Sequence, residues 1–128
     1  MSDTLMLEPK VAAFAPAKSS APMQSTAQYD SGWTKASNNP SNEILFQHGL
    51  GVIPSQISVM FSPNQNEAYP VLGYWGTSTT GNPVSISMGS ASIAIELYSG
   101  APLHGAWLAS NGNWTLWNQG YFRVFAWK

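Results

Sequence analysis

The sequence predicts an all-β protein, an antiparallel β-sandwich of about six to eight strands that follows an extended N-terminal arm. Short runs in which apolar and polar residues alternate recur at regular spacing from residue 29 onward. The first glycine of the chain is Gly32, and glycines and aromatic residues are frequent after it. No segment shows the repeat of an amphipathic helix, so we expect residues 29–128 to form one sheet domain.

Residues 1–28 are expected to form the arm. They contain prolines at positions 9, 16 and 22 and no glycine, a composition that favours extended conformations over helix. A disordered tail is one interpretation of such a segment. The arm also carries apolar side chains that a solvated linker does not need, so we predict that it docks on neighbouring subunits through Leu5, Leu7, Val11 and Phe14.

The first strands follow directly. We expect a short strand at 32–36 around Trp33, a turn at 38–42 where Asn, Pro and Ser cluster, and a strand at 43–48. In that strand Ile44, Phe46 and His48 share one face.

The clearest alternation in the chain lies at 57–62, where Ile57, Val59 and Phe61 alternate with Ser58, Met60 and Ser62. Gly49 and Gly51 predict a turn before this strand, and Pro63 with the amide cluster at 64–66 predicts its end.

The middle of the chain predicts a strand at 69–75, a polar loop at 76–82 and a β-hairpin. In the hairpin, residues 84–88 and 92–99 are joined by the tight turn at Gly89 and Ser90. Ile93, Ile95 and Leu97 are expected to face the core, with Ala94, Glu96 and Tyr98 facing outward.

A loop at 100–105 is expected around Pro102 and His104. A second hairpin, with strands at 106–109 and 113–117, is predicted by the turn at 110–112, because Asn-Gly accepts positive φ at both central positions. The last strand, 121–128, has Phe122, Val124 and Ala126 on one face and Tyr121, Arg123, Phe125 and Trp127 on the other. Since neither face is polar, we expect it to be a central strand or to lie at a subunit interface.

Composition excludes several classes of partner. The chain has 128 residues, with 5 Lys and Arg against 6 Asp and Glu, so we expect no nucleic-acid binding. Only 9% of residues are charged, which predicts that partner chains cover much of the surface, as in a homo-oligomer. Cysteine is absent, which excludes disulfides and thiolate chemistry. No apolar run reaches the roughly 20 residues that span a bilayer, so no membrane insertion is expected, nor is a cleaved signal peptide.

The sequence predicts no enzyme, no cofactor and no metal site. No nucleophile elbow, zinc motif, phosphate loop or dinucleotide fingerprint occurs. Glu43 and His48 are five residues apart on one predicted strand, so they point to opposite faces and do not form an acid–base pair. We interpret His48 as a residue that stabilises the following turn through hydrogen bonds.

Tryptophan is the notable surplus, because four of the six lie in the last 22 residues. Indole rings stack on sugar rings while amides bind their hydroxyl groups, and the same residue types also anchor protein interfaces. The segment 107–119 therefore predicts either a glycan site or packing in the core and at an interface. The candidate residues are Trp107, Asn113, Trp114, Trp117 and Asn118.

Two parts of the chain resemble H-type lectin domains, and resemble more closely the small β-sandwich modules of bacteriophage and bacterial fibre proteins. The first comprises Asp30-Ser-Gly-Trp33 with Lys35, a strand ending at Phe46, and His48-Gly-Leu-Gly51 leading through Pro54 into Ile57-Ser-Val59. The second is the last strand, Tyr121-Phe-Arg-Val124 with Ala126-Trp-Lys128.

The resemblance implies a sandwich that assembles as a trimer and, from the lectins, binding of N-acetylgalactosamine-like sugars. The chain departs from the lectin pattern because it has no Trp-His dipeptide and no cysteine, and its sole arginine is Arg123. The resemblance therefore supports the expected fold and oligomeric state of this chain better than it supports a sugar specificity.

Two functions are expected. The first is a structural virion protein of a tailed bacteriophage, a head decoration (cement) protein or short fibre whose arm attaches it to major capsid or tail subunits. The alternative is a carbohydrate-binding lectin or host-receptor-binding module that recognises a surface glycan through segment 107–119.

Overall fold

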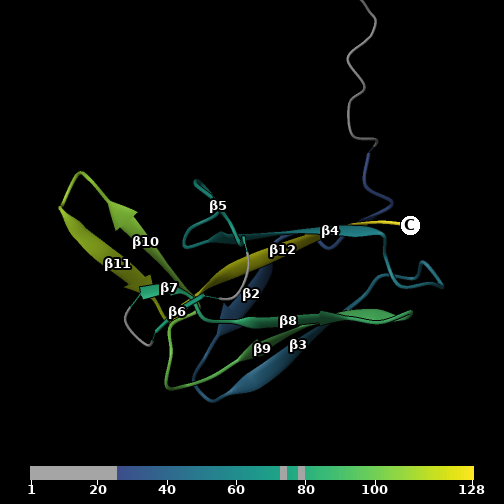
Figure 1. Cartoon of the computed structure of the whole chain (residues 1–128), viewed down its shortest axis with the longest axis horizontal. Helices are drawn as coiled ribbons and strands as arrows, with labels where there is room; N and C mark the ends of the chain where they lie inside the picture. Colours follow the sequence, from purple (N-terminus) through teal and green to yellow (C-terminus); the bar gives the residue numbers. More distant parts are fainter. Residues whose placement is uncertain (1–25, 73–74, 78–79) are drawn as a thin grey trace, which may run out of the picture.

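The computed structural model describes residues 26–72, 75–77 and 80–128, and these residues form strands, turns and loops without a helix (Figure 1). In chain order the strands are β1 (Tyr29–Asp30), β2 (Thr34–Ser37), β3 (Asn42–Gln47), β4 (Gln56–Ser62), β5 (Tyr69–Pro70), β6 (Trp75–Thr77), β7 (Thr80–Asn82), β8 (Ser85–Met88), β9 (Ser92–Leu97), β10 (His104–Leu108), β11 (Asn113–Trp117) and β12 (Gln119–Trp127). All pairings between them are antiparallel.

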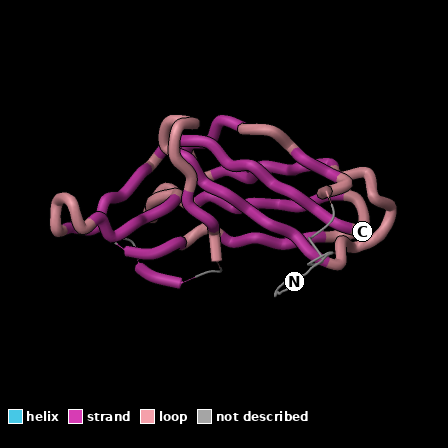
Figure 2. Tube along the Cα trace, turned by 90° about the horizontal axis from the view of Figure 1, so that it is seen from above, coloured by secondary structure: helices cyan, strands magenta, loops and turns pink. Residues whose placement is uncertain are grey.

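Two sheets build a sandwich-like all-β fold, which confirms the predicted fold class. The predicted number of six to eight strands is wrong, because the described residues form twelve, several of them only two to four residues long. In the larger sheet β12 is central, with β4 on one side and both β1 and β2 on the other, and β5 pairs with β4. In the smaller sheet β9 lies between β3 and β8. The hairpins β6–β7 and β10–β11 lie at one end, where β10–β11 projects from the body (Figure 1). Most strands run along the long axis, with loops at both ends (Figure 2).

The core consists of inward-facing side chains from both sheets, because strand alternation sends every second residue between them. The core-facing residues predicted for β9 are confirmed in this position, and one of the two predicted faces of β4 and of β12 also points inward. Ala94 faces outward as predicted but is buried, because it is small and flanked by β3 and β8. The core cluster contains Ala36, Phe46, Val59, Phe61, Val84, Ile93, Ile95, Leu97, Leu103, Phe122, Val124 and Ala126.

Several predicted boundaries are wrong. The strand expected at 69–75 ends at Pro70, and a separate strand begins at Trp75. The polar loop expected at 76–82 contains the β6–β7 hairpin, with Gly76 paired to Gly81. His104, expected in a loop, is the first residue of β10. Backbone pairing joins β6 to β7, and the sequence of these two strands has no apolar alternation from which a strand could be predicted.

Strand β12 is central, as its apolar faces predicted. Its inward face, including Phe122 and Val124, is completely buried, whereas its outward face is only half-buried in the single chain. On that face the Arg123 guanidinium lies 4.8 Å from the centre of the Phe125 ring and 5.9 Å from the Trp33 ring. A subunit interface on this face stays a prediction.

The strand predicted at 32–36 corresponds to β2, which begins two residues later, at Thr34, and a bulge separates it from the additional short strand β1. Asp30 pairs with Phe125 and Thr34 with Phe122, so residues 31–33 stand opposite only residues 123 and 124. Gly32 occupies the bulge with φ of +69°, a conformation that glycine adopts without strain.

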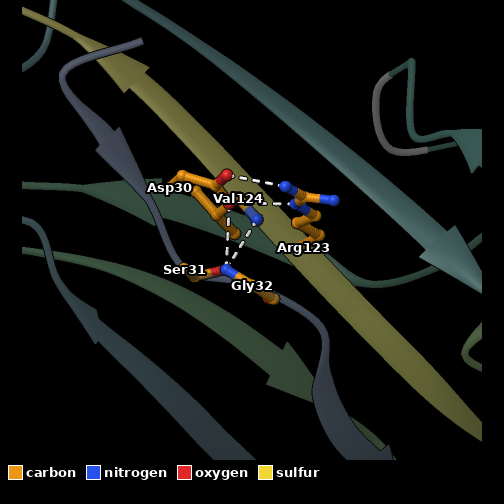
Figure 3. Close-up of polar contacts among 5 residues, drawn as sticks. All are labelled: Asp30, Ser31, Gly32, Arg123 and Val124. Carbon is orange, nitrogen blue, oxygen red and sulfur yellow. Dashed lines mark hydrogen bonds and ion pairs between the residues drawn. The ribbon is translucent and has the colours of Figure 1, made fainter.

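Side chains of the bulge attach it to β12 (Figure 3). The Arg123 Nε and Nη2 atoms donate to the Asp30 carboxylate at 2.9 and 2.6 Å, and the Gly32 N–H donates to Asp30 Oδ1 at 2.9 Å. The Val124 N–H donates to Ser31 Oγ at 2.8 Å. The hydrogen bond from Arg123 is the main reason that the pKa of Asp30 is lowered. The Asp30-Ser-Gly motif therefore positions the edge of the larger sheet.

His48 stabilises the turn that follows it, as predicted. Its Nδ1 atom accepts a hydrogen bond from the Leu50 N–H at 3.0 Å, so Nε2 carries the proton and donates to the Gly89 carbonyl at 2.8 Å. Gly49 and Gly51 both have positive φ, which confirms the predicted turn. His48 thus joins this turn to the turn between β8 and β9.

Among the described residues no helix has the length and apolar character needed to cross a bilayer.

Candidate functional site

The β10–β11 hairpin carries two exposed tryptophans, Trp107 and Trp114. Its strands pair from His104–Trp117 to Leu108–Asn113. The turn is residues 109–112, in which the N–H groups of Asn111 and Gly112 donate to the Leu108 carbonyl. Only Gly112 has positive φ, of +67°. The hairpin is therefore confirmed, but a turn with positive φ at both Asn111 and Gly112 is wrong, because the loop is longer than two residues.

One face of this hairpin is apolar and exposed. Trp107 and Trp114 are directly paired across the strands, with ring centres 6.3 Å apart in an edge-to-face arrangement. Leu116, paired with Gly105, lies next to them on the same face. The exposed fractions are 55% for Trp107, 38% for Trp114 and 40% for Leu116. We call Trp107 and Trp114 the tryptophan pair.

The opposite face anchors the hairpin to the core. His104 stacks on Phe61 at 5.2 Å and on Tyr69 at 5.5 Å between ring centres, and the Trp117 ring lies 6.2 Å from the His104 ring. Burial lowers the pKa of His104 to about 4, so its ring is neutral near pH 7. This packed base holds the tryptophan pair on a firmly attached strand pair.

A polar groove lies beside the base of the hairpin, where β2 ends and β12 begins. Its volume is about 420 Å³. Only hydroxyl and amide residues line it, namely Ser37, Asn38, Asn39, Ser99, Asn118 and Gln119. We call this hollow the amide groove.

A smaller hollow of about 170 Å³ joins the amide groove to the exposed hairpin face. Ser99 and Asn118 line both hollows, and the smaller one adds Leu116 and Pro102. The tryptophan pair, Leu116 and the amide groove therefore form a continuous surface along β11 and the residues that follow it.

The structure separates the predicted candidate residues. It brings Trp107 and Trp114 together, and it places Asn118 in the amide groove. Trp117 lies on the opposite face, in the aromatic base, because it is three residues from Trp114 in a strand.

Asn113 is at the hairpin end, where its N–H donates to Asn111 Oδ1 at 3.1 Å and its side chain to the Asn111 carbonyl at 3.4 Å. Leu5, Leu7, Val11 and Phe14 lie outside the described residues.

Sequence reasoning missed Asn38 and Asn39, and it did not name Gln119 among the candidate residues although segment 107–119 includes it. The Asn-rich segment 38–42 predicted a turn, and its polarity gave no sign that residues 118 and 119 lie beside it. The one available signal was the amide content shared by both segments.

Two of the described acidic residues lie together on the smaller sheet. Glu43 faces Glu96 across β3 and β9, and the hydrogen bond to Glu43 is the main cause of the raised pKa of Glu96. His48 is buried in its turn, apart from this pair. Within ranges 26–72, 75–77 and 80–128 no three His, Asp or Glu residues are grouped in a way that could hold a metal ion.

Comparison with known proteins finds no family model that matches the chain and no matching curated protein. The resemblance of residues 30–59 and of the last strand to H-type lectins and phage modules stays a prediction.

Proposed function

We propose that the protein is a non-enzymatic recognition module that binds a surface glycan through the tryptophan pair and the groove beside it. The observation that carries this proposal is the exposed, edge-to-face arrangement of Trp107 and Trp114 on a hairpin whose other face is packed into the core. An indole face held in place buries the apolar face of a sugar ring at little entropic cost. The amides of the adjoining groove supply hydrogen-bonding groups for its hydroxyls.

A glycan array tests the proposal directly. The wild-type chain is expected to bind saccharides, and Trp107→Ala and Trp114→Ala are each expected to weaken binding by at least about tenfold, the size of effect typical of a central aromatic contact. Leu45→Ala serves as the control, because Leu45 is 51% exposed but lies on the smaller sheet. An array without any wild-type binding, or equal binding by all four proteins, would contradict the proposal.

A second candidate is the structural virion protein, in which a homo-oligomer, for example a trimer, decorates the head or forms a short fibre. It is favoured by apolar side chains that the described chain leaves uncovered away from the hairpin, including Ile53 at 62% and Leu72 at 83% exposure. Leu72 borders an apolar groove of about 410 Å³ between β4 and β8, a surface suited to contact with capsid or tail subunits. Both roles can exist in one virion protein.

Deletion of residues 2–25 tests the role of the arm. The deletion stops before Gln28, whose N–H donates to the Ala126 carbonyl at 3.1 Å, so the sheet keeps its edge. We expect the shortened chain to remain a folded oligomer in analytical ultracentrifugation but to lose co-sedimentation with phage particles. Retained attachment would contradict this candidate and leave the glycan proposal untouched.

A further inference from the structure

The amide groove is lined by a buried side chain, that of Asn38, whose amide oxygen has no hydrogen-bond partner among the described residues. Asn38 is only 4% exposed. Its Nδ2 atom donates to the Ala101 carbonyl and, at 3.4 Å, to Asn118 Oδ1, which identifies the nitrogen side of the amide. Its Oδ1 atom accepts no hydrogen bond from any residue in the described part of the chain. A buried carbonyl in this state is costly unless a polar group meets it.

The rim of the groove adds further hydrogen-bonding groups. Asn39 and Gln119 are exposed, and neither side-chain amide forms a hydrogen bond within the described ranges. The Oδ1 atom of Asn118 is turned toward Asn38. The groove therefore offers donors and acceptors side by side, which is what a pattern of sugar hydroxyls requires.

The lining carries no charged side chain. A carboxylate or sulfate in this groove would lose hydration without gaining a counter-ion, which is unfavourable. Lys35 lines a different hollow on the other side of Gln119. The groove thus favours an uncharged ligand.

The spacing of the two ends excludes a single sugar as the whole ligand. Asn118 follows Trp114 by four residues, about 13 Å of extended chain at roughly 3.3 Å per residue. The exposed Leu116 side chain and the smaller hollow lie between Trp114 and the amide groove. A ligand that contacts both ends must therefore be a chain of several sugar rings.

We infer that the amide groove is a second saccharide subsite, which takes the hydroxyl groups of a neutral oligosaccharide whose other end stacks on the tryptophan pair. The inference rests on the proposed function and adds to it a ligand class and a named subsite. In this arrangement a hydroxyl of the ligand donates to Asn38 Oδ1, while Asn118 and Gln119 bind neighbouring hydroxyls.

Isothermal titration calorimetry of the full chain tests the subsite. The probes are cellotetraose, maltotetraose, mannotetraose and chitotetraose, the corresponding disaccharides, and tetragalacturonate as an acidic tetrasaccharide. The variants are Gln119→Ala, which keeps the bond between Asn38 and Asn118, and the double variant Asn118→Ala/Gln119→Ala. The control is Gln47→Ala/Gln56→Ala, which removes two exposed amides elsewhere. Thermal unfolding verifies that each variant is folded.

We expect at least one neutral tetrasaccharide to bind the wild type. The double variant should weaken it by about tenfold and Gln119→Ala by about threefold, in line with the loss of one to two hydrogen bonds. The control should leave binding unchanged, and disaccharide binding at the tryptophan pair should change by less than about twofold in every variant.

The contrary outcomes separate the two proposals. If Trp107→Ala abolishes tetrasaccharide binding and the double variant does not alter it, the groove holds only water, and the subsite is wrong while the proposed function stands. Tetragalacturonate binding as tightly as every neutral probe would overturn the neutral ligand class. If no probe binds and the glycan array is also empty, the proposed function fails together with this inference.

Discussion

Replacing Gly120 with alanine is expected to lower the free energy of unfolding by about 3 kcal/mol, the upper range for overpacking a core. A Cβ atom at this position would lie 2.6 Å from Cζ of Phe61 and 2.7 Å from the Ser62 carbonyl oxygen. The Phe61 ring is completely buried among core side chains, and the carbonyl belongs to the neighbouring strand β4. Neither atom can move without displacing the larger sheet.

Gly100→Ala is the matched control for this change. Its Cβ would also meet an aromatic ring, that of Tyr98, but this side chain is 66% exposed and can rotate into solvent. Urea denaturation of both variants should show a large loss for Gly120→Ala and a loss below about 1 kcal/mol for Gly100→Ala. Equal losses would show that close packing at the start of β12 is not what requires glycine.

Acidification from pH 6.5 to pH 4 is expected to destabilise the protein through His104. Burial lowers the pKa of His104 from its ordinary value of 6.5 to about 4 in the folded chain, so in this window the unfolded chain binds the extra proton. Stability therefore falls as the pH falls, by up to about 3 kcal/mol at about 1.4 kcal/mol per pKa unit. Above pH 6.5 the contribution of His104 is constant.

His104→Phe isolates this effect, because phenylalanine keeps a ring in the aromatic base and does not titrate. The pH dependence of the free energy of unfolding should be shallower in the variant between pH 4 and 6.5. Taking the difference between wild type and variant removes contributions common to both. One of these is that of Glu96, whose raised pKa makes stability rise as the pH falls, the opposite of the effect of His104. Identical pH profiles would contradict this prediction, because they would mean that the pKa of His104 is the same in the folded and the unfolded chain.

Alternation of apolar residues was sufficient to predict β4 and β9, because each has one face in the core and a side-chain period of two. The central place of β12 was predicted from the apolar character of both its faces. The hairpin β6–β7 was missed, since its pairing of Thr77 with Thr80 depends on the backbone and leaves no apolar pattern. His104 gave no signal either. A single histidine after Pro102 does not reveal that Phe61 and Tyr69 will enclose it.

The candidate site was predictable only in part. Tryptophan content pointed to segment 107–119, and strand alternation alone separates Trp117 from Trp114 once the hairpin boundaries are known. The amide groove could not be predicted from the sequence. It depends on the pairing of β2 with β12, which places Asn38 beside Asn118, 80 positions away in the chain. Unless the register of these two strands is known, the residues that lie beside the Asn-rich turn cannot be identified.

The most direct test of the central claim is an NMR titration that follows the indole N–H signals of the six tryptophans while a neutral tetrasaccharide from the calorimetric set is added. The account predicts that the signals of Trp107 and Trp114 shift progressively to saturation, together with the side-chain amide of Asn38. The signals of Trp33 and Trp127, on the larger sheet, should stay in place. Shifts confined to Trp33 and Trp127, or none at all with any of the tetrasaccharides, would contradict the claim that this hairpin is the recognition surface.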